Sequence, residues 1–313
     1  MTSSGSLTVV ARCRAGRVAE IDVQLQRPEV ARLFVGQVPE AVVRMVPCLY
    51  SLCAEAQRAA AQAALAAATG GLLPGTDGAA LWGELLHEHL WRLLLDWPAA
   101  VGLPAEKEAF VAWRGTRTRA NFLAMTEDIL GQCLLGMGSR AWDGQPAPGS
   151  LAGRCLARLP AVVEDVSCTL LSLTPGQWLP YWQGATVREP ERERPRTVAG
   201  AYRRRLQETV LAVRALAAGA PYPRGGAGGA GWGVGQTLTA RGVLTHGARV
   251  RLGRVIGYKI WAPTDDFFSG GASLLVLTAD RAVPDGTEAQ RVVDQAVLAL
   301  DPCVPYEIRI SHA

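Results

Sequence analysis

Two stretches near the N-terminus alternate apolar and polar residues with a period of two. Positions 7–13 read LTVVARC and positions 18–25 read VAEIDVQL, on either side of a turn that contains Gly16. Such alternation places the two sets of side chains on opposite faces of a strand, and a glycine between strands favours a tight reversal. The pattern predicts a β-hairpin over residues 7–25.

Apolar residues at spacings of three and four predict helices over much of the remaining chain. Residues 53–68 are mostly alanine, a strong helix former, and Gly70 follows as a cap. A shorter helical pattern starts at Glu40, and Pro47 interrupts it. The predicted helices cover residues 40–46, 53–68, 79–95, 107–115, 119–135, 197–218 and 288–300.

Short alternating stretches at 242–246, 249–252 and 255–261 predict strands, separated at Gly247 and Gly253. Residues 142–153 and 219–235 are rich in glycine and proline and are interpreted as loops, while 161–173 has no assignment. The predicted fold is α+β and mainly helical, with small antiparallel β elements near the N-terminus and before the C-terminal helix. We expect one domain over 1–313.

Composition and charge exclude several classes of function. The 313 residues are 49% hydrophobic and carry a net charge of only +4, with basic residues scattered except in the run from Arg188 to Arg205. We interpret this run as a solvated helix face and not as a nucleic-acid surface. The glycine-rich stretch at 219–235 lacks the Gly-Lys-Ser/Thr of a phosphate-binding loop. A signal-peptide pattern and a run of about 18 apolar residues are both absent from the sequence, which predicts a cytoplasmic protein without a membrane partner.

The seven cysteines form an odd set without a regular disulfide spacing, so we expect reduced thiols. Cys133, Cys155 and Cys168 are interpreted as small buried apolar side chains. Cys53 lies at the start of the alanine-rich helix, where the helix N-terminus favours a thiolate, and Cys303 lies near the other end of the chain. Together they suggest one soft-metal site, although a lone cysteine at a helix start is more often structural.

Several segments, in order along the chain, resemble the nickel-iron hydrogenase large subunit. The matching segments are GQVPEA at 36–41, CAEAQ at 53–57, ARGVLTH at 240–246, APT at 262–264 and DPC at 301–303. The resemblance implies a helical core like that of a large subunit. In that family, two Cys-x-x-Cys pairs hold nickel and an iron that carries cyanide and carbon monoxide.

The chain departs from this pattern at the metal ligands. Tyr50 and Tyr306 stand where the first and last cysteines of the two pairs belong, and Gln57 replaces a histidine. A phenol is a harder donor than a thiolate and has a reference pKa of about 10. Nickel with only two or three thiolates is therefore not a credible site for splitting hydrogen.

With one cysteine of each pair lost, the chain is similar to the HupK and HoxV type of hydrogenase maturation protein. The resemblance implies a non-catalytic scaffold that holds or assembles the Fe(CN)2CO unit for delivery to the apo large subunit. It implies Cys53 and Cys303 as iron ligands with Cys48 as a nearby third thiolate. It also implies Arg241 and Thr264 as hydrogen-bond donors to the cyanides. Iron is expected to bind transiently as Fe(CN)2CO, nickel is not expected, and the implied partners are the iron-ligand assembly proteins.

Two alternatives come from other functional classes. The first is an active, diverged hydrogenase in which Cys48, Cys53, Cys303 and Cys13 form a rearranged nickel site. The second is a metal-free structural adaptor that keeps the fold to contact maturation partners. His246 is interpreted as a buried supporting residue and not as a ligand.

Overall fold

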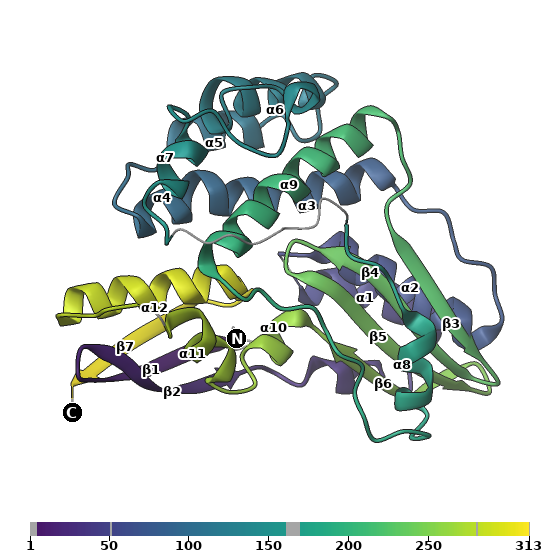
Figure 1. Ribbon diagram of the computed structural model, residues 1–313. Coiled ribbons are helices and arrows are strands. Elements are labelled where there is room, and N and C mark those ends of the chain that lie inside the picture. Colours follow the sequence, from purple (N-terminus) through teal and green to yellow (C-terminus); the bar gives the residue numbers. More distant parts are fainter. Residues whose placement is uncertain (1–4, 51, 161–169, 280, 313) are drawn as a thin grey trace.

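The computed structural model describes residues 5–50, 52–160, 170–279 and 281–312. Two small sheets lie below a group of helices, with the C-terminal helix α12 (Gly286–Leu300) above the first sheet (Figure 1). The first sheet has the strand order β2-β1-β7 and the second has β3-β4-β5-β6. The predicted α+β class is confirmed, but helices dominate less than the phrase mainly helical implies. The assignment of one domain stays a prediction.

The first sheet joins the two ends of the chain. Strands β1 (Ser6–Arg14) and β2 (Arg17–Gln26) form the predicted antiparallel hairpin. Strand β7 (Tyr306–His312) runs parallel to β1, with Leu7 opposite Tyr306 and Cys13 opposite His312. The sequence pattern predicts no strand in this tail and only antiparallel pairing, and both expectations are wrong. Because β7 begins three residues after Cys303, its pairing with β1 restricts where the thiol lies.

The second sheet is an antiparallel meander of β3 (Arg224–Gly229), β4 (Trp232–Thr239), β5 (Gly242–Arg251) and β6 (Arg254–Trp261). The predicted loop at 219–235 is therefore wrong, because most of it forms the β3–β4 hairpin. The predicted break at Gly247 is also wrong, since β5 continues through it.

Glycine in this hairpin serves close packing against helix α2 (Ala54–Thr69), which lies across β3, β4 and β5. A Cβ atom at Gly233 would lie 2.0 Å from the carbonyl oxygen of Ala64, and one at Gly235 would lie 2.2 Å from that of Ala60. An alanine-rich helix on a glycine-rich sheet brings the two backbones together at a distance that larger side chains prevent.

The helical part begins with α3 (Gly78–Trp91), which continues through a π-helical turn (Arg92–Asp96) into α4 (Trp97–Ala100). Helix α9 (Val198–Ala217) packs along α3 and confirms the helix predicted over 197–218, with Thr197 as its N-cap. The other helices of this part are α5 (Lys107–Arg114), α6 (Phe122–Ile129) with a π-helical turn at Leu130–Leu134, the 3-10 turn Ser139–Ala141, and α7 (Leu151–Leu156). The predicted loop at 142–153 ends at Ser150, which caps α7.

The remaining elements surround the two sheets. They are the 3-10 turn Val30–Phe34, α1 (Pro39–Leu49), α8 (Pro175–Trp182), α10 (Pro263–Phe267) and α11 (Ala272–Thr278). Helix α1 continues through Pro47 to Leu49, so the predicted end at residue 46 is wrong. The largest hydrophobic core joins the inner face of β1 to α3, α9 and α12.

Cys13 and Cys155 are buried and Cys133 is half-buried, while Cys168 lies outside the described residues. Within the described ranges, no helix has both the length and the apolar character needed to cross a membrane.

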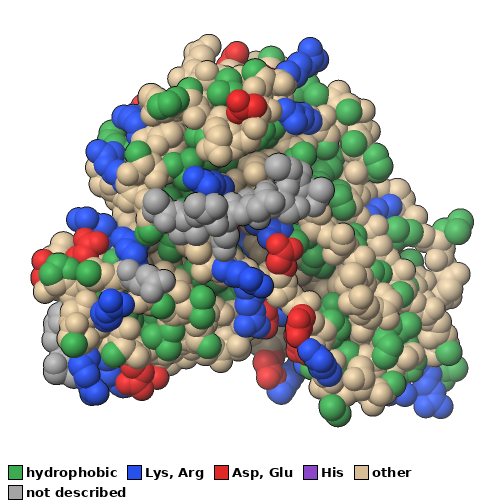
Figure 2. Space-filling model, in the orientation of Figure 1, with side chains coloured by type: hydrophobic (Ala, Val, Ile, Leu, Met, Phe, Trp, Pro, Cys, Tyr) green, Lys and Arg blue, Asp and Glu red, His purple; other side chains and the backbone are tan. Residues whose placement is uncertain are grey.

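The basic run from Arg188 to Arg205 is largely neutralised by carboxylates. Its ion pairs include Arg188–Glu191 at 2.6 Å, Arg192–Glu189 at 2.8 Å, Arg194–Asp266 at 2.6 Å and Arg204–Glu208 at 3.0 Å. Figure 2 shows basic and acidic side chains interspersed over one face of the molecule. Arg205 departs from the predicted solvated face, because it is buried against the C-terminal end of α12.

Candidate functional site

The structure brings together two of the predicted thiols from opposite ends of the chain. Cys53 is the residue before the first turn of α2, and Cys303 lies two residues beyond the C-terminal cap of α12. The thiols are close enough for a charge on Cys303 to raise the pKa of Cys53. Thr264, at the start of α10, points its hydroxyl at the Cys303 sulfur over 3.4 Å.

Burial sets the protonation state of Cys53. It raises the pKa of this thiol to about 12, the Cys303 charge adds to the effect, and the nearby Arg241 cation opposes it. At neutral pH without metal, Cys53 is therefore a neutral thiol. A metal that binds there must displace the proton, which couples metal binding to proton release.

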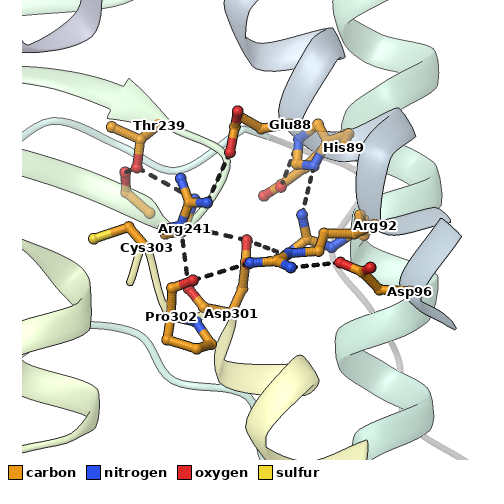
Figure 3. A network of polar contacts seen from close by, with 12 residues as sticks. Glu88, His89, Arg92, Asp96, Thr239, Arg241, Asp301, Pro302 and Cys303 are labelled. Carbon is orange, nitrogen blue, oxygen red and sulfur yellow. Dashed lines mark hydrogen bonds and ion pairs between the residues drawn. The ribbon is translucent and has the colours of Figure 1, made fainter. Parts of the chain in front are cut away.

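Arg241 lies in the turn between β4 and β5 and is buried. Its Nη2 donates to Glu88 of α3 over 2.7 Å, and its Nε donates to the backbone carbonyl of Asp301 over 3.2 Å (Figure 3). Its Nη1 is buried and has no hydrogen-bond partner among the described residues. Unsatisfied buried donors are rare in folded proteins, and this guanidinium interacts electrostatically with both thiols, so its unused donor fits a bound group with an acceptor atom.

A buried carboxylate holds the segment that carries Cys303. Asp301 ends α12 with a left-handed backbone, φ 51°, and accepts hydrogen bonds from Arg92 at 2.6 Å and Arg205 at 2.9 Å (Figure 3). Burial alone would raise the pKa of Asp301, but Arg241, Arg92 and Arg205 together hold it well below its usual range. Asp301 is thus an anion that ties three cations from different elements to the end of α12.

Helix α2 is capped by a residue from another helix, so the Cys53 sulfur has no capping role. The Cys53 side chain accepts no capping hydrogen bond. Glu84 of α3 instead accepts from the backbone N–H groups of Glu55 at 2.8 Å and Ala56 at 2.9 Å. Glu84 is buried in this capping position, and its burial raises the pKa of its carboxyl group to about 7.

A chain of hydrogen bonds connects the second sheet to Cys53. Gln57 Nε2 lies 3.6 Å from the Cys53 sulfur, and Gln57 Oε1 lies 2.9 Å from His246 Nε2. Tyr258 lies 2.7 Å from His246 Nδ1, and burial lowers the pKa of His246 to about 3. A neutral His246 that accepts from Tyr258 donates to Gln57, so Gln57 donates to sulfur. His246 is therefore a buried supporting residue, as the sequence predicts.

Sequence reasoning missed Arg27, which follows the end of β2. Its Nη2 donates to the Cys303 sulfur over 2.7 Å, and its Nε forms an ion pair with Asp265 at 3.0 Å. Burial opposes the cation, yet Cys303 and Asp265 hold the pKa of Arg27 above its usual value. Nothing near Arg27 in the sequence signals this contact, because 276 residues separate it from Cys303.

The other predicted ligand positions differ in their surroundings. Cys48 is exposed on α1, where its thiol lies 3.6 Å from the Arg44 carbonyl oxygen, and the structure does not gather it with the other two thiols. Tyr50 lies near them, since the charges of Cys53 and Cys303 both act on its phenol. Tyr306 instead donates to Asp294 of α12 over 2.7 Å. Among the described residues, no group of three or more His, Cys, Asp or Glu side chains has the spacing of a metal site.

Comparisons with known proteins agree on one family. The hydrogenase expression/formation protein HupK of Azotobacter vinelandii is 31% identical over 347 aligned residues, which cover 99% of this chain and 100% of the relative. HupV of Azotobacter chroococcum mcd 1 is 30% identical with the same coverage, and HoxV of Cupriavidus necator is 27% identical over 100% of this chain and 98% of the relative. No family model matches the chain.

Solved structures show the fold. The nickel-iron-selenium hydrogenase of Desulfovibrio vulgaris Hildenborough, in its reduced state, has a TM-score of 0.55 at 14% identity and covers 93% of this chain and 94% of its own. A glycine variant of that enzyme under oxygen has a TM-score of 0.56 at 13% identity, with 96% and 99% coverage. The chain therefore has the fold of a hydrogenase large subunit and belongs to the HupK, HupV and HoxV family of hydrogenase expression/formation proteins.

Proposed function

We propose that the chain takes part in nickel-iron hydrogenase maturation as a non-catalytic, cytoplasmic scaffold. Its cargo is the Fe(CN)2CO unit, held between Cys53 and Cys303 until it passes to the apo large subunit. The observation that carries the proposal is the buried Nη1 of Arg241, which lacks a partner among the described residues and belongs to a guanidinium that interacts electrostatically with both thiols. The names of the relatives support the maturation role itself.

The donor set suits this cargo. Thiolates are soft ligands that bind low-spin iron well, and here they leave the other coordination positions to cyanide and carbon monoxide. Cyanide nitrogen carries partial negative charge, so the Arg241 guanidinium and the Thr264 hydroxyl are suitable donors. Two protein thiolates hold the unit less firmly than three would, which suits a carrier that must release it.

Nickel fits the same residues poorly. Tyr50 supplies a phenol whose pKa burial raises further above its usual value, so it is a weak ligand at neutral pH. Tyr306 is occupied by Asp294. The proposal therefore excludes hydrogen turnover, and it names the iron-ligand assembly proteins and the apo large subunit as the partners.

Infrared spectroscopy tests the proposal on protein produced together with the iron-ligand synthesis machinery. We expect bands of bound cyanide and carbon monoxide in the wild type, and their loss in Cys53→Ser and Cys303→Ser. Cys133→Ser serves as the matched control because Cys133 is a half-buried thiol outside the site. Arg241→Lys should shift the cyanide bands, because Lys lacks the fork that donates to nitrogen. A spectrum without such bands in the wild type rejects the scaffold.

Cys48→Ser decides whether the third predicted thiol takes part. Because Cys48 is exposed on α1, we expect this variant to keep both sets of bands.

Stoichiometric nickel with hydrogen-dependent dye reduction would instead support a diverged hydrogenase. If hydrogenase maturation in cells tolerates serine at both 53 and 303, the chain is a metal-free adaptor.

A further inference from the structure

Two arginines approach the thiol pair, and they differ in how they do so. Each leaves one buried N–H group without a hydrogen-bond partner, Nη1 in Arg241 and Nε in Arg27, but only Arg27 donates directly to the Cys303 sulfur, over 2.7 Å. Arg27 Nε also lies 3.0 Å from Asp265 Oδ1, an ion pair without the geometry of a hydrogen bond. The Arg27 side chain is only 23% exposed, so it is held at this sulfur and is not a mobile surface group.

Arg27 also lies next to Tyr50. Its charge acts on the Tyr50 phenol, and the phenol in turn feels both thiols. Arg27, Tyr50 and Asp265 therefore form one cluster at the thiol pair, built from the residue after β2, the residue after α1, and α10. Thr264, the neighbour of Asp265, also points its hydroxyl at the Cys303 sulfur.

We propose that Arg27 is a specificity-determining residue: it favours a metal complex that brings its own anionic ligands and disfavours bare divalent cations at the thiol pair. The inference rests on the proposed function and names the charge state of the cargo. The proposed preference follows from geometry, because the Arg27 guanidinium binds the same Cys303 sulfur that a metal would bind.

Charge explains the preference. A divalent iron with two cyanides has no net charge before it meets the thiolates, so a neighbouring guanidinium does not repel it as a whole. A bare Zn²⁺, Ni²⁺ or Cd²⁺ brings two positive charges next to Arg27, and at a few ångströms in a partly buried site such repulsion is several-fold stronger than in water. Arg27 also donates to a lone pair of Cys303, so this sulfur has one lone pair fewer to offer a metal.

Cadmium binding to the purified, metal-free protein tests the inference without iron. Cd²⁺ reports its bonds to thiolates by a charge-transfer absorption band, which gives the affinity directly. We expect Arg27→Gln to bind Cd²⁺ at least about tenfold more tightly than the wild type, equivalent to about 1.4 kcal/mol. Adding Cys53→Ser or Cys303→Ser to Arg27→Gln should abolish the gain.

Two matched variants separate charge from structure. Arg27→Lys keeps the cation and should bind Cd²⁺ as the wild type does. Arg32→Gln removes an 82% exposed arginine of the same segment, whose partner is Glu29, and should also change nothing. An Arg27→Gln protein that folds but binds Cd²⁺ no more tightly than the wild type overturns the inference.

Asp265→Asn provides a second measurement if Arg27→Gln does not fold. Removing this carboxylate leaves the Arg27 charge uncompensated, so Cd²⁺ affinity should fall several-fold, and an unchanged or higher affinity contradicts the inference.

Different measurements test the scaffold and the role of Arg27. Wild-type protein without cyanide bands rejects the scaffold whatever Cd²⁺ does, and unchanged Cd²⁺ affinities reject the role of Arg27 even if the bands are present.

Discussion

Asp301→Asn is the substitution whose cost can be worked out most directly from the structure. Asparagine keeps the shape of the side chain and one acceptor oxygen but removes the charge. Arg92 retains Asp96 and the Pro302 carbonyl. Arg205 loses the carboxylate that it binds at 2.9 Å. Removing one partner of a buried ion pair costs about 3–5 kcal/mol, and we expect a loss near the lower end.

The expected loss is large compared with the total stability of a folded protein, about 5–15 kcal/mol. Chemical denaturation at pH 7, followed by circular dichroism, measures it. Asp22→Asn is the control, because Asp22 forms an exposed ion pair with Arg12 at 2.9 Å that solvent screens. If the two variants lose similar stability, the account of Asp301 as an anchor for three cations is refuted.

The pH dependence of this loss has a definite sign. The folded-state pKa of Asp301 is lower than its unfolded value, which is about 3.9 for aspartate. The charge therefore contributes its full stability above that value, and the contribution is lost as the pH falls through the folded pKa. The difference in unfolding free energy between wild type and Asp301→Asn should stay constant from about pH 5 to 8 and narrow only below about pH 4.

Two further predictions concern the second sheet and the thiols. Gly235→Ala should lower the free energy of unfolding, measured with urea, by about 3 kcal/mol or more, because its Cβ would lie 2.2 Å from both the Ala60 oxygen and the Ala64 nitrogen. Gly225→Ala is the control and should be tolerated, because its Cβ would meet no atom nearer than 3.8 Å. Iodoacetamide at pH 8 should alkylate the exposed Cys48 well before Cys53, because a pKa of about 12 leaves Cys53 with little thiolate. The rate at Cys53 should rise as the pH approaches 12. Peptide mass mapping measures both rates, and equal rates at pH 8 would contradict this order.

Periodicity predicted the elements whose side chains alternate or repeat, and it missed those that depend on contacts across the chain. The hairpin at 7–25 and the helix at 53–68 were found because their own residues carry the pattern. The β3–β4 hairpin was missed because glycine carries no apolar signal, and its role is visible only beside the alanines of α2. Strand β7 was missed because its partner β1 is about 300 residues away in the sequence.

The order of the sequence motifs along the chain predicted part of the candidate site. Cys53, Cys303, Arg241 and Thr264 were named from the sequence, and the structure brings them together. Cys48 was named because of its proximity in sequence to Cys53, but α1 continues through Pro47 and holds this thiol on an exposed face.

The parallel pairing of β7 with β1 has a consequence for how the protein is made. Strand β1 leaves the ribosome 292 residues ahead of Tyr306, since 306 minus 14 is 292. At about 5–20 residues per second, the hairpin waits roughly 15–60 s for its third strand. Until then β1 has an open edge, and the Cys303 thiol is not held beside Cys53. Any site that needs both thiols can therefore form only after translation has passed β7.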